Sequence, residues 1–144
     1  MTFEVPRIRR SLLIVLLSHD GLAVFLRRHL GHFVRRPPQW PVPTGLTETK
    51  ALRKWRRLHA ALPAMTLGTV TGRMSVMVEA ELHLYAIVIL KLAAPADTSS
   101  LPHDGSWHAL PSLAEAPVFP AELPHLIEGY VNGWIPDGPI TLDS

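Results

Sequence analysis

The chain has 144 residues, of which 47% are hydrophobic and 18% charged, with 14 prolines and no cysteine. This composition suits one domain with an apolar core, and it excludes collagen-like, wholly disordered and disulfide-scaffold proteins. Without a thiol, the chain also lacks the ligands of a zinc ribbon or iron–sulfur cluster and has no cysteine nucleophile. We predict a single domain over residues 1–144, with a core over about 8–132 and a loosely packed tail at 134–144.

The formal net charge of +2 conceals an asymmetry along the chain. Residues 1–73 hold 13 of the 14 Lys and Arg and three of the 12 Asp and Glu, a formal charge of +10; residues 74–144 carry −8. A basic half can attract phosphates or an acidic partner. Alternatively, the two halves fold together and neutralise each other.

The first third of the chain indicates a hairpin followed by a basic loop. Residues 11–17 are a continuous apolar run of strand length, and 22–28 are the second strand. Asp20-Gly21 between them supplies the positive φ angles of a tight turn. Residues 29–38 are polar and basic, and prolines at 41 and 43 favour an extended segment over 39–43.

The next segment predicts an amphipathic helix. Thr47 or Thr49 can cap its start, and Pro63 stops it after about Leu62. Apolar residues recur close to helical spacing through Leu52, Trp55, Leu58 or His59, and Leu62. The opposite face carries five cations: Lys50, Arg53, Lys54, Arg56 and Arg57.

The second half alternates strands with short helices. Residues 67–78 and 82–92 read as strands joined by a turn at Glu79-Ala80, and 82–92 is apolar enough on both faces for a central strand. A loop at 93–105 precedes a short strand at 106–110 and a turn of helix at 111–116. Pro120 opens a helix through Glu128 that ends near Gly129 or Gly133.

This order predicts an α+β fold, an α/β/α sandwich in which helices flank a mixed β-sheet. The apolar runs fall far short of the ~20 residues that cross a bilayer. We therefore expect a soluble, cytoplasmic protein with no membrane partner.

The order of motifs resembles the Nudix superfamily over about residues 8–132. The residues that carry the resemblance are Arg27-Arg28 at the end of the hairpin, Trp40-Pro41-Val42-Pro43-Thr44-Gly45, Leu67-Gly68-Thr69-Val70-Thr71, Leu82-His83-Leu84-Tyr85, and Trp107 to Leu113 before the proline-led helix. The last three look most like the Nudix-like C-terminal domain of adenine DNA glycosylases. The resemblance implies a Nudix-like mixed sheet flanked by helices.

The catalytic motif of that family is absent. An active Nudix box places several glutamates on one helix, where they bind Mg²⁺ that bridges a diphosphate. Counted from Gly45, the motif positions are Ala51, His59, Ala60, Pro63 and Ala64. A substitute metal site from Glu48, Glu79 and Glu81 is the alternative. We predict no metal site and no cofactor, and favour a chain that is not an enzyme.

Cations on the helix suggest a different chemistry. Guanidinium groups contact phosphate directly, so Lys50, Arg53, Lys54, Arg56 and Arg57, with Arg35 and Arg36, are the candidate phosphate-binding residues. Trp40, Arg73 and Ser75 are the candidate base-contacting residues. In the glycosylase domain the loop that senses the oxidised base reads His-x-aromatic-Ser-His, and only Ser75 matches it here. The alternative is a solvated helix face.

Three hypotheses follow. The leading one is a catalytically degenerate Nudix-fold module that binds a nucleotide or nucleic-acid phosphate. The second is a divergent nucleoside-diphosphate pyrophosphohydrolase whose metal ligands come from elsewhere. The third is a subunit whose basic surface docks an acidic protein.

Overall fold

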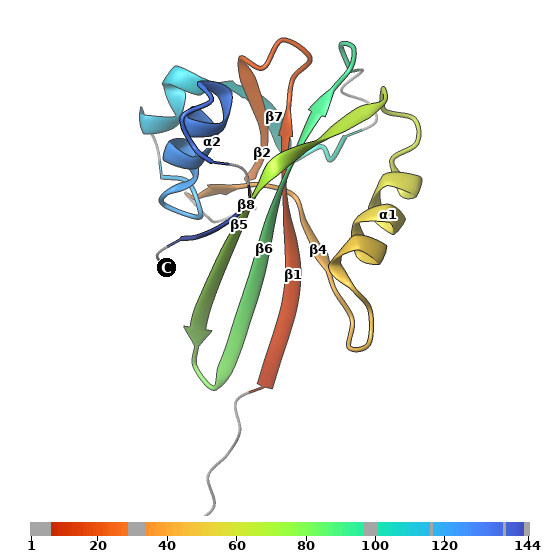
Figure 1. The fold of residues 1–144 in the computed structure, drawn as a ribbon, viewed down its shortest axis with the longest axis vertical. Helices are drawn as coiled ribbons and strands as arrows, with labels where there is room; N and C mark the ends of the chain where they lie inside the picture. The colour runs from red at the N-terminus through yellow and green to blue at the C-terminus, as the bar shows by residue number, and fades with distance from the viewer. Residues whose placement is uncertain (1–6, 29–33, 97–100, 116, 137, 143–144) are drawn as a thin grey trace, which may run out of the picture.

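The computed structural model describes residues 7–28, 34–96, 101–115, 117–136 and 138–142. Its central feature is a mixed sheet of eight strands (Figure 1). The strands are β1 Arg7–Leu17, β2 Ala23–Arg28, β3 Arg35–Arg36, β4 Gln39–Pro41, β5 Met65–Val78, β6 Glu81–Leu92, β7 Gly105–Ala109 and β8 Gly138–Thr141. The helices are α1 Glu48–Leu58 and α2 Leu123–Val131, with a 3₁₀ segment at Leu110–Glu115.

The longest strands form the middle of the sheet in the order β3-β2-β1-β6-β5-β8. β1 runs parallel to β6 along its whole length, and β5 pairs antiparallel with β6. β2 pairs with β1 only at Leu16 and Leu17 and then diverges, and β4 pairs with β1 at residues 11–13. On the edge of β1 that faces away from β6, the end of the strand therefore pairs with β2 and its middle pairs with β4.

Two apolar clusters cover the two faces of the sheet. Side chains alternate between faces along a strand, so Leu13, Val15 and Leu17 pack with Leu123 and Ile127 of α2. On the other face, Leu12, Ile14 and Leu16 pack with Leu52 and Trp55 of α1. Figure 1 shows the two helices on opposite sides of the sheet. This arrangement confirms the predicted α+β sandwich with a mixed sheet.

The helix boundaries refine the sequence predictions. Thr47 is the N-cap of α1, since its hydroxyl accepts a hydrogen bond from the Lys50 amide at 3.2 Å. α1 ends at Leu58, and residues 59–62 continue as turns before Pro63. α2 begins at Leu123, three residues after the predicted start, and Pro124 occupies its first turn.

The prediction of a loosely packed tail at 134–144 is wrong for the residues described. β8 pairs parallel with β5 from Val70 to Arg73, and the Leu142 amide donates to the Arg73 carbonyl at 2.7 Å. Leu142 is buried and belongs to the α2-side cluster. A four-residue strand containing a proline gives little periodic signal, and the open edge of β5 supplies the hydrogen bonds that order it.

Among the described residues, the helices are all too short or too polar to cross a membrane.

Candidate functional site

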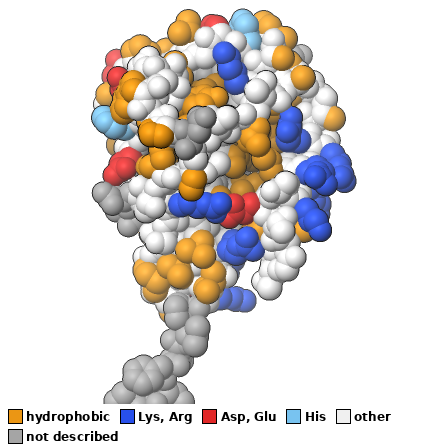
Figure 2. Space-filling model, in the orientation of Figure 1, with side chains coloured by type: hydrophobic (Ala, Val, Ile, Leu, Met, Phe, Trp, Pro, Cys, Tyr) orange, Lys and Arg blue, Asp and Glu red, His pale blue; other side chains and the backbone are white. Residues whose placement is uncertain are grey.

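The outer face of α1 is a surface of exposed cations. Ala51, Leu52 and Trp55 are buried against the sheet, which turns Lys50, Arg53, Lys54 and Arg57 toward solvent. We call these four residues the α1 cationic face. Figure 2 shows Lys and Arg side chains gathered on the side of the molecule that α1 occupies. Four of the five predicted helix cations therefore remain accessible to a ligand.

Arg56 lies at the margin of this surface and has a structural contact. Its guanidinium donates to the Met65 carbonyl at 2.8 Å, which ties the helix to the start of β5. Between α1 and β5 there is a shallow depression of about 480 Å³. Its lining residues are Thr49, Leu52, Arg53, Arg56, Arg57, Ala60 and Leu67. The depression thus combines an apolar floor with an arginine rim.

No ion pair with a carboxylate neutralises the α1 cationic face within the described part of the chain. In the described residues, the basic and acidic halves are joined by the ion pairs Arg9–Glu81 at 2.9 Å and Arg27–Asp104 at 2.8 Å, both outside α1. Glu48, the one acidic residue in α1, forms an ion pair with Arg73. Mutual neutralisation of the two halves therefore occurs on the sheet and leaves the helix face charged.

The three acids considered as substitute metal ligands are not brought together. Glu48 contacts Arg73, whose side chain shares the α1 side of the sheet with Ala86. Glu81 contacts Arg9 and His83 on the opposite, α2 side. Within the described ranges, there is no group of three or more His, Asp or Glu side chains arranged to hold a metal ion.

Arg35 and Arg36 lie apart from α1, on the short strand β3. Arg35 is buried, with its guanidinium 2.8 Å from Nδ1 of His108. Burial, and then the nearby Arg35 charge, lower the pKa of His108. Arg36 lies over the Phe119 ring, 4.5 Å from its centroid, and donates to Oε1 of Gln39 at 3.1 Å. Arg35 therefore has a structural position, whereas Arg36 borders an open groove.

The three predicted base-contacting residues do not form one site. Trp40 is half-buried and packs against the α1-side cluster. Arg73 and Ser75 line a separate cavity of about 230 Å³, together with Arg10, Glu48 and Tyr85. Trp55, the other tryptophan near the helix cations, is buried and stacks on His59 with ring centroids 4.2 Å apart.

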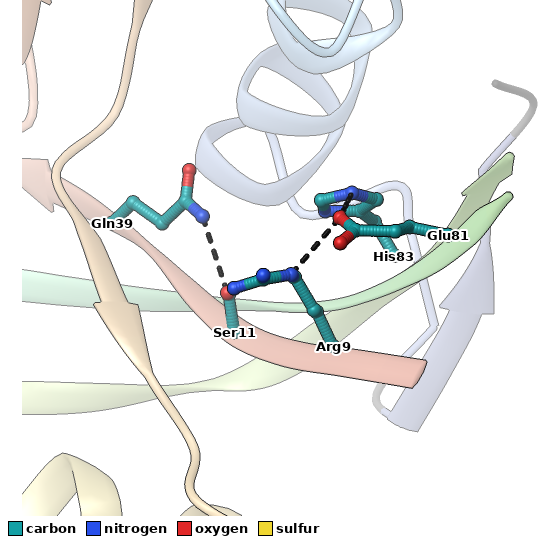
Figure 3. Close-up of polar contacts among 5 residues, drawn as sticks. All are labelled: Arg9, Ser11, Gln39, Glu81 and His83. Atoms are coloured by element: carbon teal, nitrogen blue, oxygen red, sulfur yellow. Dashed lines mark hydrogen bonds and ion pairs between the residues drawn. The ribbon is translucent and has the colours of Figure 1, made fainter. Parts of the chain in front are cut away.

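Sequence reasoning missed a larger groove on the α2 side of β1. It measures about 720 Å³ and lies where β2 diverges from β1. Figure 3 shows its polar floor: Arg9 Nε donates to Glu81 at 2.9 Å, and Gln39 Nε2 donates to Ser11 Oγ at 3.1 Å. The alternation of Arg7, Arg9 and Ser11 ahead of the apolar run was the available signal, because it extends the strand with a polar face.

No protein-family model matches the chain, and no curated protein matches it at a significant level. Solved structures do. A Nudix hydrolase from M. smegmatis, RenU, has a TM-score of 0.59 and 23% identity. The match covers 93% of this chain and 91% of the RenU chain. C. elegans Ap4A hydrolase has a TM-score of 0.63 and 14% identity. The match covers 88% of this chain and 98% of the hydrolase chain.

A third similar structure is not described as a hydrolase. The C-terminal domain of mouse MUTYH, solved in complex with human PCNA, has a TM-score of 0.61 and 19% identity, covering 92% of this chain and 94% of that one. At these identities the likeness shows the fold. Both kinds of domain that the sequence resembles are thus found among the structural neighbours.

Proposed function

We propose that this chain, which has the Nudix fold, is a phosphate-binding module for nucleic acid or nucleotide, without the Mg²⁺-dependent hydrolytic centre of the family. The observation that carries the proposal is the α1 cationic face. Lys50, Arg53, Lys54 and Arg57 are exposed with no carboxylate partner in the described regions, and the one acid of the helix is paired with Arg73.

Electrostatics favours a phosphate ligand over a metal ion at this helix. A Mg²⁺ ion placed there would meet several positive charges and no available carboxylate, and Mg²⁺ depends on carboxylate and phosphate oxygens. A phosphate group, in contrast, receives charge-assisted hydrogen bonds from guanidinium and ammonium groups without an intervening cation. In this proposal the helix cations replace the metal as the phosphate-binding element.

The depression beside α1 supports binding of a chain of nucleotides. Its apolar floor, with Leu52 and Leu67, can contact a base or sugar while Arg53 and Arg57 reach the flanking phosphates. The chain is proposed to act in the cytoplasm, as the sequence suggests, and without a bound cofactor.

A direct test is fluorescence anisotropy with labelled single-stranded DNA, RNA and duplex, in EDTA and at two salt concentrations. We expect salt-sensitive binding, and a loss of affinity of about tenfold or more for Arg53→Glu/Arg57→Glu. The matched control is Arg28→Glu/Lys91→Glu, which makes the same charge change at exposed positions outside α1. Equal losses in the two variants, or no binding by the wild type, would remove the proposal.

An acidic protein partner is the second candidate, because the same unpaired cations would attract carboxylates and one structural neighbour was solved in a protein complex. Capture of one specific acidic protein by the wild type but not by Arg53→Glu/Arg57→Glu, with no affinity for nucleic acid, would select it. Phosphate release from nucleoside diphosphates with Mg²⁺ or Mn²⁺ that EDTA abolishes would instead select the divergent hydrolase.

A further inference from the structure

The groove on the α2 side of β1 is a second basic site, separate from α1. Its floor continues the strand face that packs against α2, because Arg9 and Ser11 have the same parity as Leu13 and Val15. At this end of the sheet the face is lined by polar side chains. Five arginines belong to the lining. Four of them, which we call the groove arginines, are Arg7, Arg9, Arg27 and Arg36. The fifth, Arg10, donates to the Leu46 carbonyl at 3.1 Å on the α1 side of the sheet and is not counted with them.

The charges of the groove are unbalanced. Glu81 is the one carboxylate among its lining residues, and it pairs with Arg9. Arg27 is held from outside the groove by a two-pronged contact with Asp104, at 2.8 and 3.1 Å. Arg7 and Arg36 have no carboxylate partner among the residues that the structure describes. The groove therefore retains an excess of two positive charges, from Arg7 and Arg36.

Glu81 marks a place where an anion is held. Its Oε2 accepts from Arg9 Nε at 2.9 Å and lies 3.3 Å from His83 Nε2 (Figure 3). The Arg9 guanidinium would donate equally well to a phosphate oxygen, and so would His83 Nε2 when it carries a proton. The Glu81 carboxylate therefore competes with any anionic ligand for the Arg9 guanidinium.

Further donors are available beside this position. Ser11 Oγ accepts from Gln39, so its own hydrogen is free to donate into the groove. Arg36 also lines the groove, where its guanidinium is oriented by the Phe119 ring and by Gln39. By contrast, no Trp, Tyr or Phe side chain belongs to the described lining. The groove thus offers donors for phosphates and no large ring on which a base could stack.

We propose that this groove binds a small polyanion with two or three phosphate groups, recognised through its phosphates rather than through a base. The volume of about 720 Å³ suits a ligand of this size. The site differs from the proposed α1 surface in position and in ligand, since it lies on the other side of the sheet and is enclosed on several sides by β1, β4 and β6.

The test is calorimetric titration of the full chain with inorganic triphosphate, ATP and adenosine, in EDTA at low salt. We expect triphosphate and ATP to bind with dissociation constants within about threefold of each other, and adenosine not to bind. ATP binding that is tenfold tighter than triphosphate would overturn recognition through phosphate alone. Absence of triphosphate binding would overturn the site.

Variants assign the binding to the groove. Arg9→Gln and Arg36→Gln should each weaken triphosphate binding by about tenfold or more, because each removes a charge-assisted contact. Arg9 is half-exposed, so its substitution leaves the core intact, and thermal melting checks this. Wild-type affinity in Arg9→Gln and Arg36→Gln would overturn the proposal.

Glu81→Gln gives a result in the opposite direction. It removes the internal competitor, so triphosphate should bind several-fold more tightly, whereas the control Glu128→Gln on the exposed side of α2 should leave affinity unchanged. Arg53→Gln/Arg57→Gln should also leave it unchanged, which separates this site from the α1 surface. Loss of triphosphate binding only in the α1 variant would place the ligand on α1 and reject the groove.

Discussion

At the scale of single residues, the chain uses its arginines in distinct ways that depend on burial and partners. Arg35 is buried beside His108, Arg56 binds a backbone carbonyl, and Arg73 pairs with Glu48. Arg53 and Arg57 remain exposed on α1. The sequence shows how many cations are present, but only the packing of each side chain decides which ones can meet a ligand.

His108 should make stability depend on pH. Burial and the Arg35 charge lower its pKa in the folded chain, so the unfolded chain, with a pKa near 6.5, binds more protons below neutrality. The free energy of unfolding should therefore fall as the pH drops below about 6.5. Urea titrations from pH 5 to pH 8 would show this slope, and His108→Gln should flatten it.

The control for this prediction is His103→Gln, at an exposed position on the loop before β7. It should preserve the wild-type pH slope. Identical slopes for wild type and His108→Gln would show that the contact with Arg35 does not control protonation of this ring.

At the scale of elements, α1 begins where its cap is satisfied. The hydroxyl of Thr47 accepts from the Lys50 amide, so Thr47→Ala should lower the free energy of unfolding by about 1 kcal/mol. Thr49→Ala, in the first turn, should be neutral or slightly stabilising because alanine has the higher helix propensity. Chemical denaturation of the two variants would distinguish these positions, and equal losses would contradict the assignment of the cap.

The segment formed by β8 and the following Leu142 should contribute measurably to stability. Leu142 is buried against the α2-side cluster, so Leu142→Ala should cost about 2 kcal/mol of unfolding free energy. Thr141→Ala on the same segment is exposed and should cost much less. A change below a few tenths of a kcal/mol for Leu142→Ala would restore the interpretation of a loosely packed tail.

The sequence predicted elements that are fixed by local pattern and missed those fixed by distant partners. The apolar runs of β1 and β6 and the helical spacing of α1 were recognisable from neighbouring residues. The polar start of β1 at Arg7 was missed because it is held in the sheet by parallel pairing with β6. Arg7 is paired there with Glu81, which lies 74 residues later in the sequence. The groove was missed for a related reason, since it depends on the divergence of β2 from β1.

The predicted site residues show the same division. Helical periodicity was enough to place Lys50, Arg53, Lys54 and Arg57 on one exposed face. It could not place Trp40 of β4 relative to Arg73 and Ser75 of β5, because the neighbours of the two strands are set by the topology of the sheet.

At the scale of the whole molecule, the positive charge of the first half of the sequence remains exposed on α1 in the folded chain. Binding of a single strand by four cations should release counterions and give a log–log salt slope of about −3, so affinity should fall about fiftyfold between 50 and 200 mM salt. Arg53→Glu/Arg57→Glu should reduce the slope to about half or less. Affinity that is independent of salt would contradict contact with phosphates.

The most direct measurement is a titration of the ¹⁵N-labelled chain with a short single-stranded oligonucleotide in EDTA, followed by amide NMR shifts. The account predicts that the shifts concentrate on residues 48–58 of α1, and that adding Mg²⁺ afterwards does not strengthen them. Shifts at α1 that appear only once Mg²⁺ is present would contradict the claim that cations of the chain have taken the place of the metal.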